Sequence, residues 1–406
     1  MTRRKPSNSS RTQPFANLHG MIICANSASH LWPLSREHAP LELACDTTDG
    51  RSPLARAIEA VKPYCVAPLV IAAPHDIAPH VKKHIVEHDL LADEDYQLLV
   101  EPHPRGAALT TALVAATVKL TDPHAILLCL PATVGFEPDD RWEQALRRAH
   151  RSAGQGRIAL VGSSATPLMR SSNERTRAAA IHEQATGQTP PLIGAIRMGR
   201  ECEKDDGAYQ VRSFIARPAP AIAWRAEQGK SLWSSHIFML GADLALAELR
   251  AAGRESNDPF MHSVQRIAET ARFFVSLGSE HWSSNEAAKL VETLPDLSFE
   301  EAVFETTKQL TVIPTSLSFT DLATLVGYEQ AIAADARDNR LRGRALAIQT
   351  ENSTVLADGE KLVVTLGLRD AIVIDTGDAT LVTTRSALAS MPSVIAALRN
   401  ADAPEL

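Results

Sequence analysis

The chain has 406 residues, with 41 Lys and Arg against 48 Asp and Glu, so its formal net charge is −7 with neutral histidine. This balance argues against non-specific binding of nucleic acid over the whole surface, and a polyphosphate ligand would need locally placed cations or a metal. Apolar residues make up 45% and charged residues 22%, which fits a globular protein with one large α/β domain and a smaller module.

An alternation of strands and helices organises the first part of the chain. Residues 1–20 are rich in Arg, Ser, Asn and Pro and predict a disordered leader. Short apolar runs then alternate with helical segments, which is typical of a parallel sheet with helices on both faces. The predicted strands are Met21–Ala25, Pro68–Ala73, Gln97–Glu101, Ala125–Leu130 and Arg157–Gly162. The predicted helices are Pro53–Val61, His75–His88, Gly106–Leu120 and Asp139–Ser152.

The middle of the chain is less regular, and polar residues between Thr166 and Gln188 predict a long surface loop. Two short elements, a helix at Glu300–Thr307 and a strand at Gln309–Pro314, are predicted before a charged, weakly periodic stretch at Ala331–Arg344. We place the domain boundary in that stretch, with an α/β domain at 21–335. The other elements predicted here are strands Tyr209–Ile215 and Trp233–Leu240, a helix ending at Gln228, and helices Ala242–Ala252 and Pro259–Val275.

Residues 336–406 predict a small β domain. Its short strands follow one another at a spacing set by turn residues, so they could be the coils of a β-solenoid. They are Asn352–Leu356, Lys361–Leu366, Ala371–Asp375 and Thr380–Thr384, followed by a helix at Pro392–Arg399.

No feature of the sequence indicates a membrane, an export signal or a cysteine-based site. The longest apolar run, Ala125–Leu130, is too short to span a bilayer, and no signal-peptide pattern follows the basic start. The five cysteines show no CxxC spacing, so neither a zinc knuckle nor a disulfide framework is indicated. We therefore expect a cytoplasmic protein that binds neither membrane nor nucleic acid.

The loop after the first strand is the first candidate site, because ligands bind beyond the carboxyl ends of the strands in such sheets. Its small side chains could let backbone amides approach an anion. It contains no glycine, so only Asn26 would accept a positive φ easily. On composition alone, a packed loop anchored by Trp32 is favoured over phosphate binding. The loop consists of Ala25, Asn26, Ser27, Ala28, Ser29 and His30, and continues to Arg36.

The segment Leu31–Arg36, four residues before Pro40, resembles the signature of the mannose-1-phosphate guanylyltransferases, which make GDP-mannose. Further matches follow in the family's order and extend from about Met21 to Arg399. The resemblance implies a Rossmann-like, GT-A-like nucleotidyltransferase fold with a mixed sheet and a small C-terminal β-helix-like domain. The isomerase domain fused to some members is not expected. The further matches are Glu101–Arg105, Leu130–Ala132, Phe214–Pro218, Leu232–Phe238, Ala302–Glu305 and parts of Leu362–Ala379.

The resemblance also implies a chemistry: a sugar 1-phosphate attacks the α-phosphate of GTP and releases pyrophosphate, with Mg²⁺ neutralising charge. Several positions where the family has the residues for this chemistry carry other types here. In the nucleotide segments, Ala25, Asn26 and Ala28 replace glycines, His30 replaces Arg, and Leu41 replaces Lys. Thr133 replaces a metal carboxylate and Val134 a histidine; on the sugar side, Ala216, Arg217, Ser234 and His236 replace Glu, Lys, Asn and Gly.

Three charged positions match the family. Asp321 would be the second metal carboxylate, and Arg105 and Glu305 also match. Each has an alternative interpretation: Asp321 as the N-cap of a helix at Leu322–Gly327, Arg105 as a surface residue at a helix start, and Glu305 as a solvated helix residue.

Two hypotheses about function follow. In the first, the chain is a non-catalytic member with a binding or regulatory role, with an active paralogue or further copies of itself as partners. In the alternative, it is an active but diverged nucleotidyltransferase that needs Mg²⁺ and uses His30, Arg105, Arg217 and Asp321. The candidate small ligands are GTP, GDP-mannose and a sugar 1-phosphate.

Overall fold

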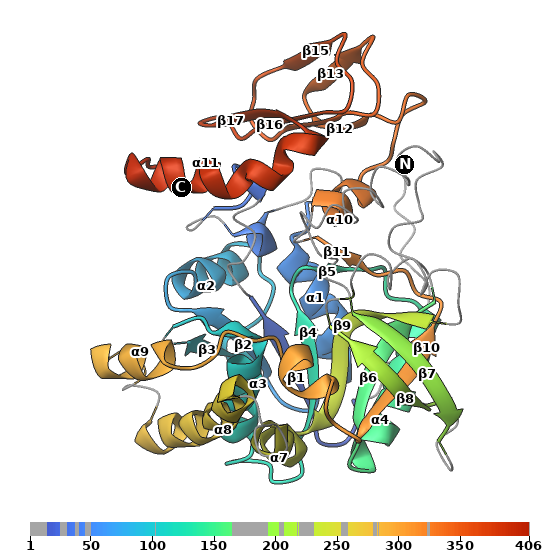
Figure 1. Cartoon of the computed structure of the whole chain (residues 1–406), viewed down its shortest axis with the longest axis vertical. Coiled ribbons are helices and arrows are strands. Elements are labelled where there is room, and N and C mark those ends of the chain that lie inside the picture. Colours follow the sequence, from blue (N-terminus) through green and yellow to red (C-terminus); the bar gives the residue numbers. More distant parts are fainter. Residues whose placement is uncertain are drawn as a thin grey trace.

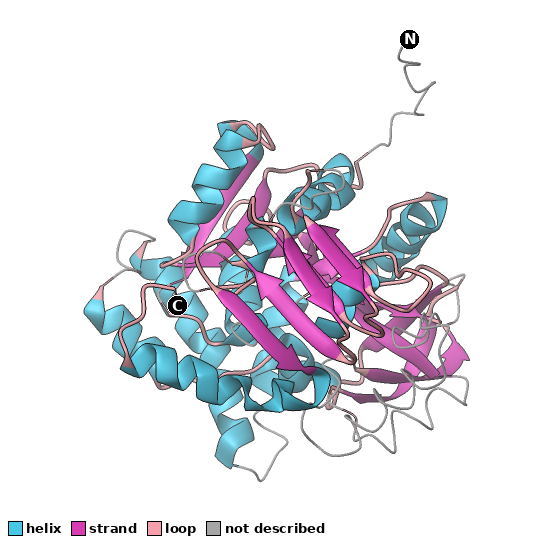
Figure 2. Cartoon of the chain, turned by 90° about the horizontal axis from the view of Figure 1, so that it is seen from above, coloured by secondary structure: helices cyan, strands magenta, loops and turns pink. Residues whose placement is uncertain are grey.

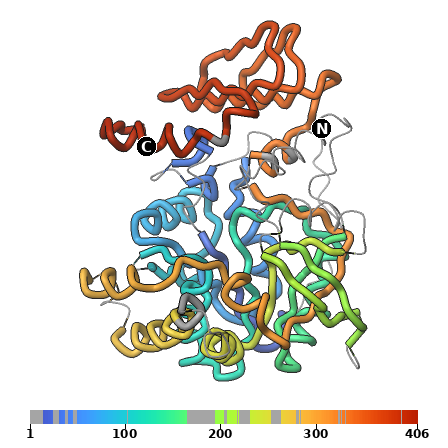
Figure 3. The backbone as a smooth tube through the Cα atoms, viewed as in Figure 1, coloured from blue at the N-terminus to red at the C-terminus, as the bar shows by residue number. Residues whose placement is uncertain are grey.

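The computed structural model describes residues 14–24, 31–36, 40–44, 50–101, 103–164, 194–202, 207–216, 218, 231–252, 259–278, 282, 284–322 and 325–405. An α/β body carries a small β domain and the C-terminal helix at one end (Figure 1). The path of the backbone in Figure 3 shows that the chain completes the body before it enters the β domain. In the described part of the chain, no helix is long and apolar enough to cross a lipid bilayer.

A mixed sheet forms the centre of the body. In the described residues it has the strand order β3-β2-β1-β4-β9-β6-β10-β8-β7. Its first four strands are parallel, as the strand–helix rhythm predicted, but β9 lies antiparallel between β4 and β6. The sheet is therefore mixed, as the family resemblance implied. The strands are β1 (Leu18–Ile23), β2 (Leu69–Pro74), β3 (Tyr96–Glu101), β4 (Ile126–Pro131), β6 (Ile158–Ser163), β7 (Ala195–Glu201), β8 (Tyr209–Ile215), β9 (Ser231–Gly241) and β10 (Leu310–Thr315).

Helices cover both faces of this sheet, which explains the continuous apolar runs of its central strands. Alternate side chains of β1 enter two different cores: Met21 packs with α3, α7 and α8, and Ile22 packs with α1, α2 and α4. The helices are α1 (Pro53–Val61), α2 (Ala78–Glu87), α3 (Gly106–Val118), α4 (Asp140–Gly154), α7 (Ala242–Ala252), α8 (Pro259–Leu277), α9 (Asn285–Glu292), α10 (Leu325–Gln330) and α11 (Met391–Asn400).

The folded domain begins earlier than the predicted leader allows. β1 starts at Leu18, and the buried ring of Phe15 lies 5.6 Å from the ring of Tyr64 and beneath the guanidinium of Arg147. Residues 14–20 are therefore part of the domain. The polar composition of residues 1–20 hid the apolar Phe15 and Leu18 from the sequence analysis. Residues 1–13 lie outside the described part of the chain.

Several other predicted elements differ from the structure or lie outside its described residues. The helix expected at Glu300–Thr307 is a shorter π-helix at Glu300–Phe304. The surface loop predicted at 166–188 and the helix predicted to end at Gln228 lie outside the described residues. The helix α9 was not predicted, nor were the strands at residues 134–135, 195–201, 320–321, 340–343 and 345–348.

The C-terminal domain is a short parallel solenoid. β12, β14 and β16 stack in parallel on one side, and β13 and β15 stack on another. β17 then turns back antiparallel along β16 and ends the stack. Seen from above in Figure 2, the strands of this domain lie in front of the body. They are β12 (Arg340–Gly343), β13 (Ala345–Ile348), β14 (Thr354–Ala357), β15 (Val363–Leu366), β16 (Ala371–Asp375) and β17 (Thr380–Thr384).

The segment Leu31–Arg36 joins the two domains. Leu31 and Leu34 pack against Ile372 and Ile374 of β16, so the segment and the solenoid share one apolar cluster. Trp32 packs against Met391 and Ile395 of α11, and its indole N–H donates to the Glu405 carbonyl at 2.8 Å. Trp32 is thus an anchor, as its sequence context suggested, and what it anchors is the C-terminal domain.

The contact between Gly106, at the start of α3, and the backbone of Leu297 can be tested by mutation. Gly106 adopts φ +71° and lies against Leu297, whose carbonyl oxygen would be 2.2 Å from an added Cβ. We predict that Gly106→Ala lowers the free energy of unfolding by about 3 kcal/mol, because left-handed strain and a backbone clash add together. Urea denaturation measures this loss.

The matched control is Gly156→Ala. Gly156 has a similar φ of +76° with no atom within 4 Å of an added Cβ. We expect it to cost only the conformational strain, about 1 kcal/mol. Equal losses for the two variants would contradict the docking explanation.

Candidate functional site

A pocket opens where β6 and β9 meet a short two-stranded ribbon. The ribbon consists of β5 (Val134–Gly135) and β11 (Thr320–Asp321), paired antiparallel. The pocket is small and partly open to solvent. Its lining residues are Val134, Ser163, Trp233, Ser234, Ser235, His236, Phe319, Thr320 and Asp321.

The ribbon brings together the two positions that the family resemblance assigned to metal binding. Asp321 pairs with Val134, and the Leu322 amide donates to the Thr133 carbonyl at 2.9 Å. The helix-cap interpretation of Asp321 is wrong, because Asp321 belongs to a strand and α10 begins only at Leu325. Among the described residues that line the pocket, Asp321 is therefore the one carboxylate, where the family resemblance implies two.

These residues do not form a magnesium site by themselves. Mg²⁺ is usually held by one or two carboxylates together with substrate phosphates, and a neutral hydroxyl supplies none of the charge of a carboxylate. Asp321 supplies one carboxylate, and Thr133 offers only a hydroxyl. Over the described ranges, no three His, Cys, Asp or Glu side chains are grouped so that they could hold a metal ion. We therefore assign no chemical step to a metal.

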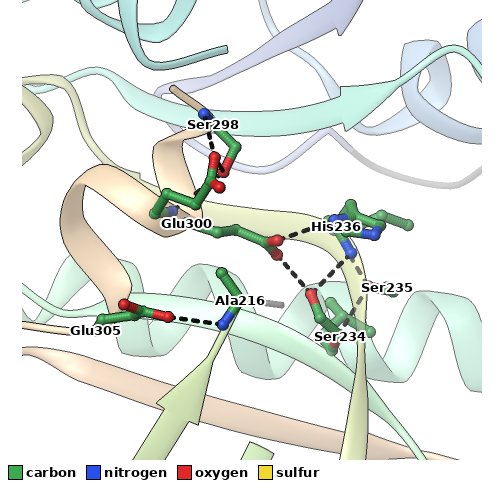
Figure 4. Close-up of polar contacts among 10 residues, drawn as sticks. Ala216, Ser234, Ser235, His236, Ser298, Glu300 and Glu305 are labelled. Carbon is green, nitrogen blue, oxygen red and sulfur yellow. Dashed lines mark hydrogen bonds and ion pairs between the residues drawn. The ribbon is translucent and has the colours of Figure 1, made fainter. Parts of the chain in front are cut away.

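Two polar side chains of β9, Ser234 and His236, contact a buried glutamate (Figure 4). The Ser234 hydroxyl donates to one carboxylate oxygen of Glu300 at 2.6 Å, and Nδ1 of His236 lies 3.0 Å from the other. The His236 amide also donates to the Ser234 hydroxyl at 3.1 Å. Glu300 is 5% exposed, so these contacts satisfy a carboxylate that would otherwise be costly to bury.

His236 has a backbone conformation that favours glycine. Its φ is +61°, at the position where the family resemblance places a glycine. A non-glycine residue pays roughly 1–2 kcal/mol for this conformation, although histidine adopts it more readily than most residues. Its contacts with Glu300 and Ser234 hold it there, and its imidazole lines the pocket.

Glu305 and Arg105 both make contacts within the body. Glu305 accepts a hydrogen bond from the Ala216 amide at 2.9 Å, which fixes the end of β8 (Figure 4). The side chain of Glu305 is therefore exposed, but it also makes a tertiary hydrogen bond, which the interpretation as a solvated helix residue did not include. Arg105 immediately precedes α3 and donates to the Glu292 carbonyl, in the last turn of α9, at 2.9 Å. This places a cation at a helix C-terminus, where it is favourable, and Arg105 does not line the pocket.

Arg36 is bound by the C-terminal domain. Its guanidinium donates to both carboxylate oxygens of Asp378 at 2.6 Å and to the Thr376 hydroxyl at 2.6 Å. The side chain of Arg36 is only 13% exposed. This bidentate contact holds the pKa of the Asp378 carboxyl well below its usual range. The cation at the end of the nucleotide segment thus has a partner inside the protein.

Of the remaining predicted positions in the nucleotide and sugar sites, one is buried and the others lie outside the described residues. Leu41, where the family has lysine, is fully buried in the domain junction. The loop residues Ala25, Asn26, Ser27, Ala28, Ser29 and His30, together with Arg217, lie outside the described residues.

A buried carboxylate near the loop was not given a role by the sequence. Glu101 ends β3 and is 4% exposed; burial raises its pKa to about 7, opposed by a hydrogen bond from Thr110. Burial also raises the pKa of the neighbouring Cys24 thiol, and the charges of Glu42 and Glu101 raise it further. The sequence signal that could have indicated this buried carboxylate was an acidic residue at the end of a mostly apolar predicted strand.

Glu101 predicts a pH dependence of stability. Its folded-state pKa of about 7 exceeds the ordinary 4.5, so the folded state keeps a proton that the unfolded state releases. Stability from this group therefore falls as pH rises from about 4.5 to 7 and stays lost above it. We predict that Glu101→Gln is more stable than the parent at pH 8 by about 1–3 kcal/mol, and that the difference closes towards pH 4. Urea denaturation at both pH values measures this difference.

The exposed Glu94 provides the control, since Glu94→Gln should leave the pH profile unchanged. An equal advantage of Glu101→Gln at both pH values would contradict the assignment.

The Arg36–Asp378 contact predicts a coupling energy. In a double-mutant cycle with Arg36→Ala and Asp378→Ala, we expect about 1 kcal/mol or more, because the guanidinium is largely buried and the contact is bidentate. The exposed pair Arg51–Glu59, at 2.7 Å, is the control and should give less than about 0.5 kcal/mol. Thermal unfolding of all variants measures both values, and equal coupling in the two pairs would refute the prediction.

Comparison with known proteins supports the family resemblance. The family model described as MannoseP isomerase/GMP-like beta-helix domain matches residues 343–389. The alginate biosynthesis protein AlgA of Pseudomonas aeruginosa is 27% identical over 386 residues, covering 92% of this chain and 71% of that protein. The mannose-1-phosphate guanylyltransferase of Escherichia coli is 26% identical over 389 residues, covering 94% of this chain and 73% of that protein.

The fold matches a solved structure over nearly its whole length. A protein from Thermus thermophilus, described as mannose-1-phosphate geranyltransferase, superposes with a TM-score of 0.73 at 20% identity. The match covers 94% of this chain and 99% of that one. The chain is a homologue of the mannose-1-phosphate guanylyltransferases, with a sugar nucleotidyltransferase fold and a C-terminal β-helix domain.

Proposed function

We propose that this homologue does not transfer nucleotides at the rate of an ordinary guanylyltransferase and has a binding or regulatory role. An active paralogue is the partner that such a role would suit. The observation that carries the proposal is the β5–β11 ribbon, where Asp321 pairs with Val134 and the neighbouring Thr133 stands where the family resemblance places a second carboxylate. Loss of one carboxylate weakens the grip on a magnesium ion, which the reaction needs to neutralise charge on the triphosphate.

The charge of the pocket supports the same proposal. Among its described lining residues there is one carboxylate, Asp321, and neither lysine nor arginine. GTP is highly negative, so a pocket of this kind attracts it weakly. Arg36, the cation that ends the nucleotide segment, is already paired with Asp378.

The steric arrangement adds a third argument. The imidazole of His236 lines the pocket where the family resemblance places a glycine, which has no side chain. The Ser234 hydroxyl points to Glu300 and is committed to it at 2.6 Å. The side chains of Ser234 and His236, at the expected sugar site, thus already make hydrogen bonds within the protein.

The alternative is an active but diverged nucleotidyltransferase. It is favoured by one observation: Asp321 is retained and lines the pocket. In that case Mg²⁺ would be held by Asp321 and substrate phosphates, and His30 and Arg217 would supply cations.

An assay of pyrophosphate release decides between the two. With GTP, mannose 1-phosphate and Mg²⁺, we predict a rate at least about 10²-fold below that of the Escherichia coli relative, because a transition-state contact worth a few kcal/mol is missing. Calorimetry with GTP, GDP-mannose and mannose 1-phosphate should show any binding to be independent of Mg²⁺.

The variant Thr133→Asp restores the second carboxylate and should make GTP binding depend on Mg²⁺. The near-isosteric Thr133→Asn adds no charge and should not. Turnover comparable to the relative, abolished by Asp321→Asn, would overturn the proposal and establish the alternative.

A further inference from the structure

The pocket beside the β5–β11 ribbon offers different donor atoms from those that the family resemblance implies. Two of its lining side chains carry atoms that can bind a metal ion strongly: the carboxylate of Asp321 on β11 and the imidazole of His236 on β9. The resemblance implies a second carboxylate at the metal and a glycine in place of His236. The pocket therefore has one oxygen donor fewer and one nitrogen donor more.

Glu300 determines which nitrogen of His236 carries the proton (Figure 4). The Ser234 hydroxyl accepts from the His236 amide at 3.1 Å, so its own proton is donated to Glu300 at 2.6 Å. The other oxygen of Glu300 lies 3.0 Å from Nδ1 of His236. Because a carboxylate accepts hydrogen bonds, this network assigns the proton to Nδ1 and the lone pair of the neutral ring to Nε2. A neutral imidazole with such a lone pair is the form in which histidine binds metals.

A buried carboxylate behind an imidazole is the usual support of a metal-binding histidine. Such histidines almost always donate their other ring nitrogen to a carboxylate, a carbonyl or a water, which orients the ring and raises its basicity. Glu300 is buried and begins the π-helix Glu300–Phe304, a kind of turn that occurs frequently at functional sites. Trp233 and Phe319 add apolar walls to the pocket, and such walls limit the access of water to a bound ion.

The backbone at His236 is also typical of a functional position. Its φ of +61° would suit glycine without strain, yet the chain has a histidine there. Residues held in such conformations against their own preference cluster at active sites and ligand-binding sites. The strain at His236 is thus accompanied by an imidazole that lines the pocket.

Charge balance favours a divalent cation as the occupant. Asp321 lines the pocket and Glu300 lies behind the imidazole, while the described lining residues include neither lysine nor arginine. A doubly positive ion bound at Asp321 and the imidazole offsets the charge of both carboxylates. An anionic ligand alone would instead be repelled by them.

We infer that the pocket binds a divalent transition-metal ion such as Zn²⁺ through Asp321 and Nε2 of His236, in preference to Mg²⁺, with Glu300 as a positioning residue. Imidazole nitrogen suits Zn²⁺, whereas Mg²⁺ prefers oxygen ligands. Two protein ligands leave the other coordination positions to water or to an oxygen of a bound ligand. The inference concerns ion binding alone and does not depend on whether the chain turns over nucleotides.

Calorimetric titration of the metal-free full chain with Zn²⁺ and with Mg²⁺ tests the site. One Zn²⁺ should bind per chain, at least about 10-fold more tightly than Mg²⁺. His236→Gly removes the nitrogen donor and introduces the residue that best accepts the left-handed backbone, so this variant should fold. His236→Gly and Asp321→Asn should each weaken Zn²⁺ binding at least about 10-fold. Thermal melting without metal will confirm that both variants fold.

The positioning role of Glu300 has its own test. Glu300→Gln keeps the shape of the side chain but removes its charge, and it should weaken Zn²⁺ binding by about 10-fold or more. It should also shift the visible absorption spectrum of Co²⁺ bound in place of Zn²⁺, because the imidazole becomes a weaker donor. If Glu300 had only a structural role, the variant would melt at a lower temperature and leave the Co²⁺ spectrum unchanged, and the positioning role would be refuted.

The matched control is His88→Gln on α2. The ring of His88 lies 4.3 Å from that of His84, so these two histidines are the competing place for Zn²⁺. Zn²⁺ affinity should not change in this variant. A chain that binds no Zn²⁺ or binds Mg²⁺ more tightly would overturn the inference, as would Zn²⁺ binding that is lost in His88→Gln and kept in His236→Gly. No turnover is measured here, so this test and the pyrophosphate assay can fail independently.

Discussion

The ion pair between Arg36 and Asp378 connects the two halves of the molecule, and the arrangement around the nucleotide segment depends on it. The two residues are 342 positions apart, yet both oxygens of the carboxylate meet the guanidinium at 2.6 Å. Burial of Trp32 and Leu31 against the C-terminal elements adds apolar contacts to the same junction. The segment that leaves the predicted nucleotide loop is therefore held by the second domain.

A second buried charge organises the pocket. The Glu300 carboxylate has two partners on β9, and those partners are the side chains that differ from the family at the sugar side. A buried carboxylate that lost one partner would carry an uncompensated desolvation cost. The replacements at Ser234 and His236 are therefore mutually dependent, and together they hold the left-handed turn of β9 without a glycine.

The sequence predicted much of the fold where apolar periodicity was strong. The helices at Pro53–Val61 and Ala242–Ala252 and the strand at Tyr209–Ile215 have the predicted bounds. The strands β5 and β11 have two residues each, too few for any pattern, although they pair Asp321 with Val134, the residue after Thr133. The partner of Arg36 could not be predicted either, because a contact over so long a separation leaves no local signal. The roles of Glu305 and Arg105 also depend on tertiary contacts.

The turn from Thr376 to Ala379 ends the solenoid and also holds Arg36, since it carries Asp378. The number of coils in this domain thus sets the position of the Asp378 carboxylate relative to Arg36. One more parallel coil in place of this reversal would carry the carboxylate away from the junction by about one strand spacing, roughly 4.8 Å, which is too far for a bidentate contact. The length of the solenoid is therefore matched to the position of the nucleotide segment.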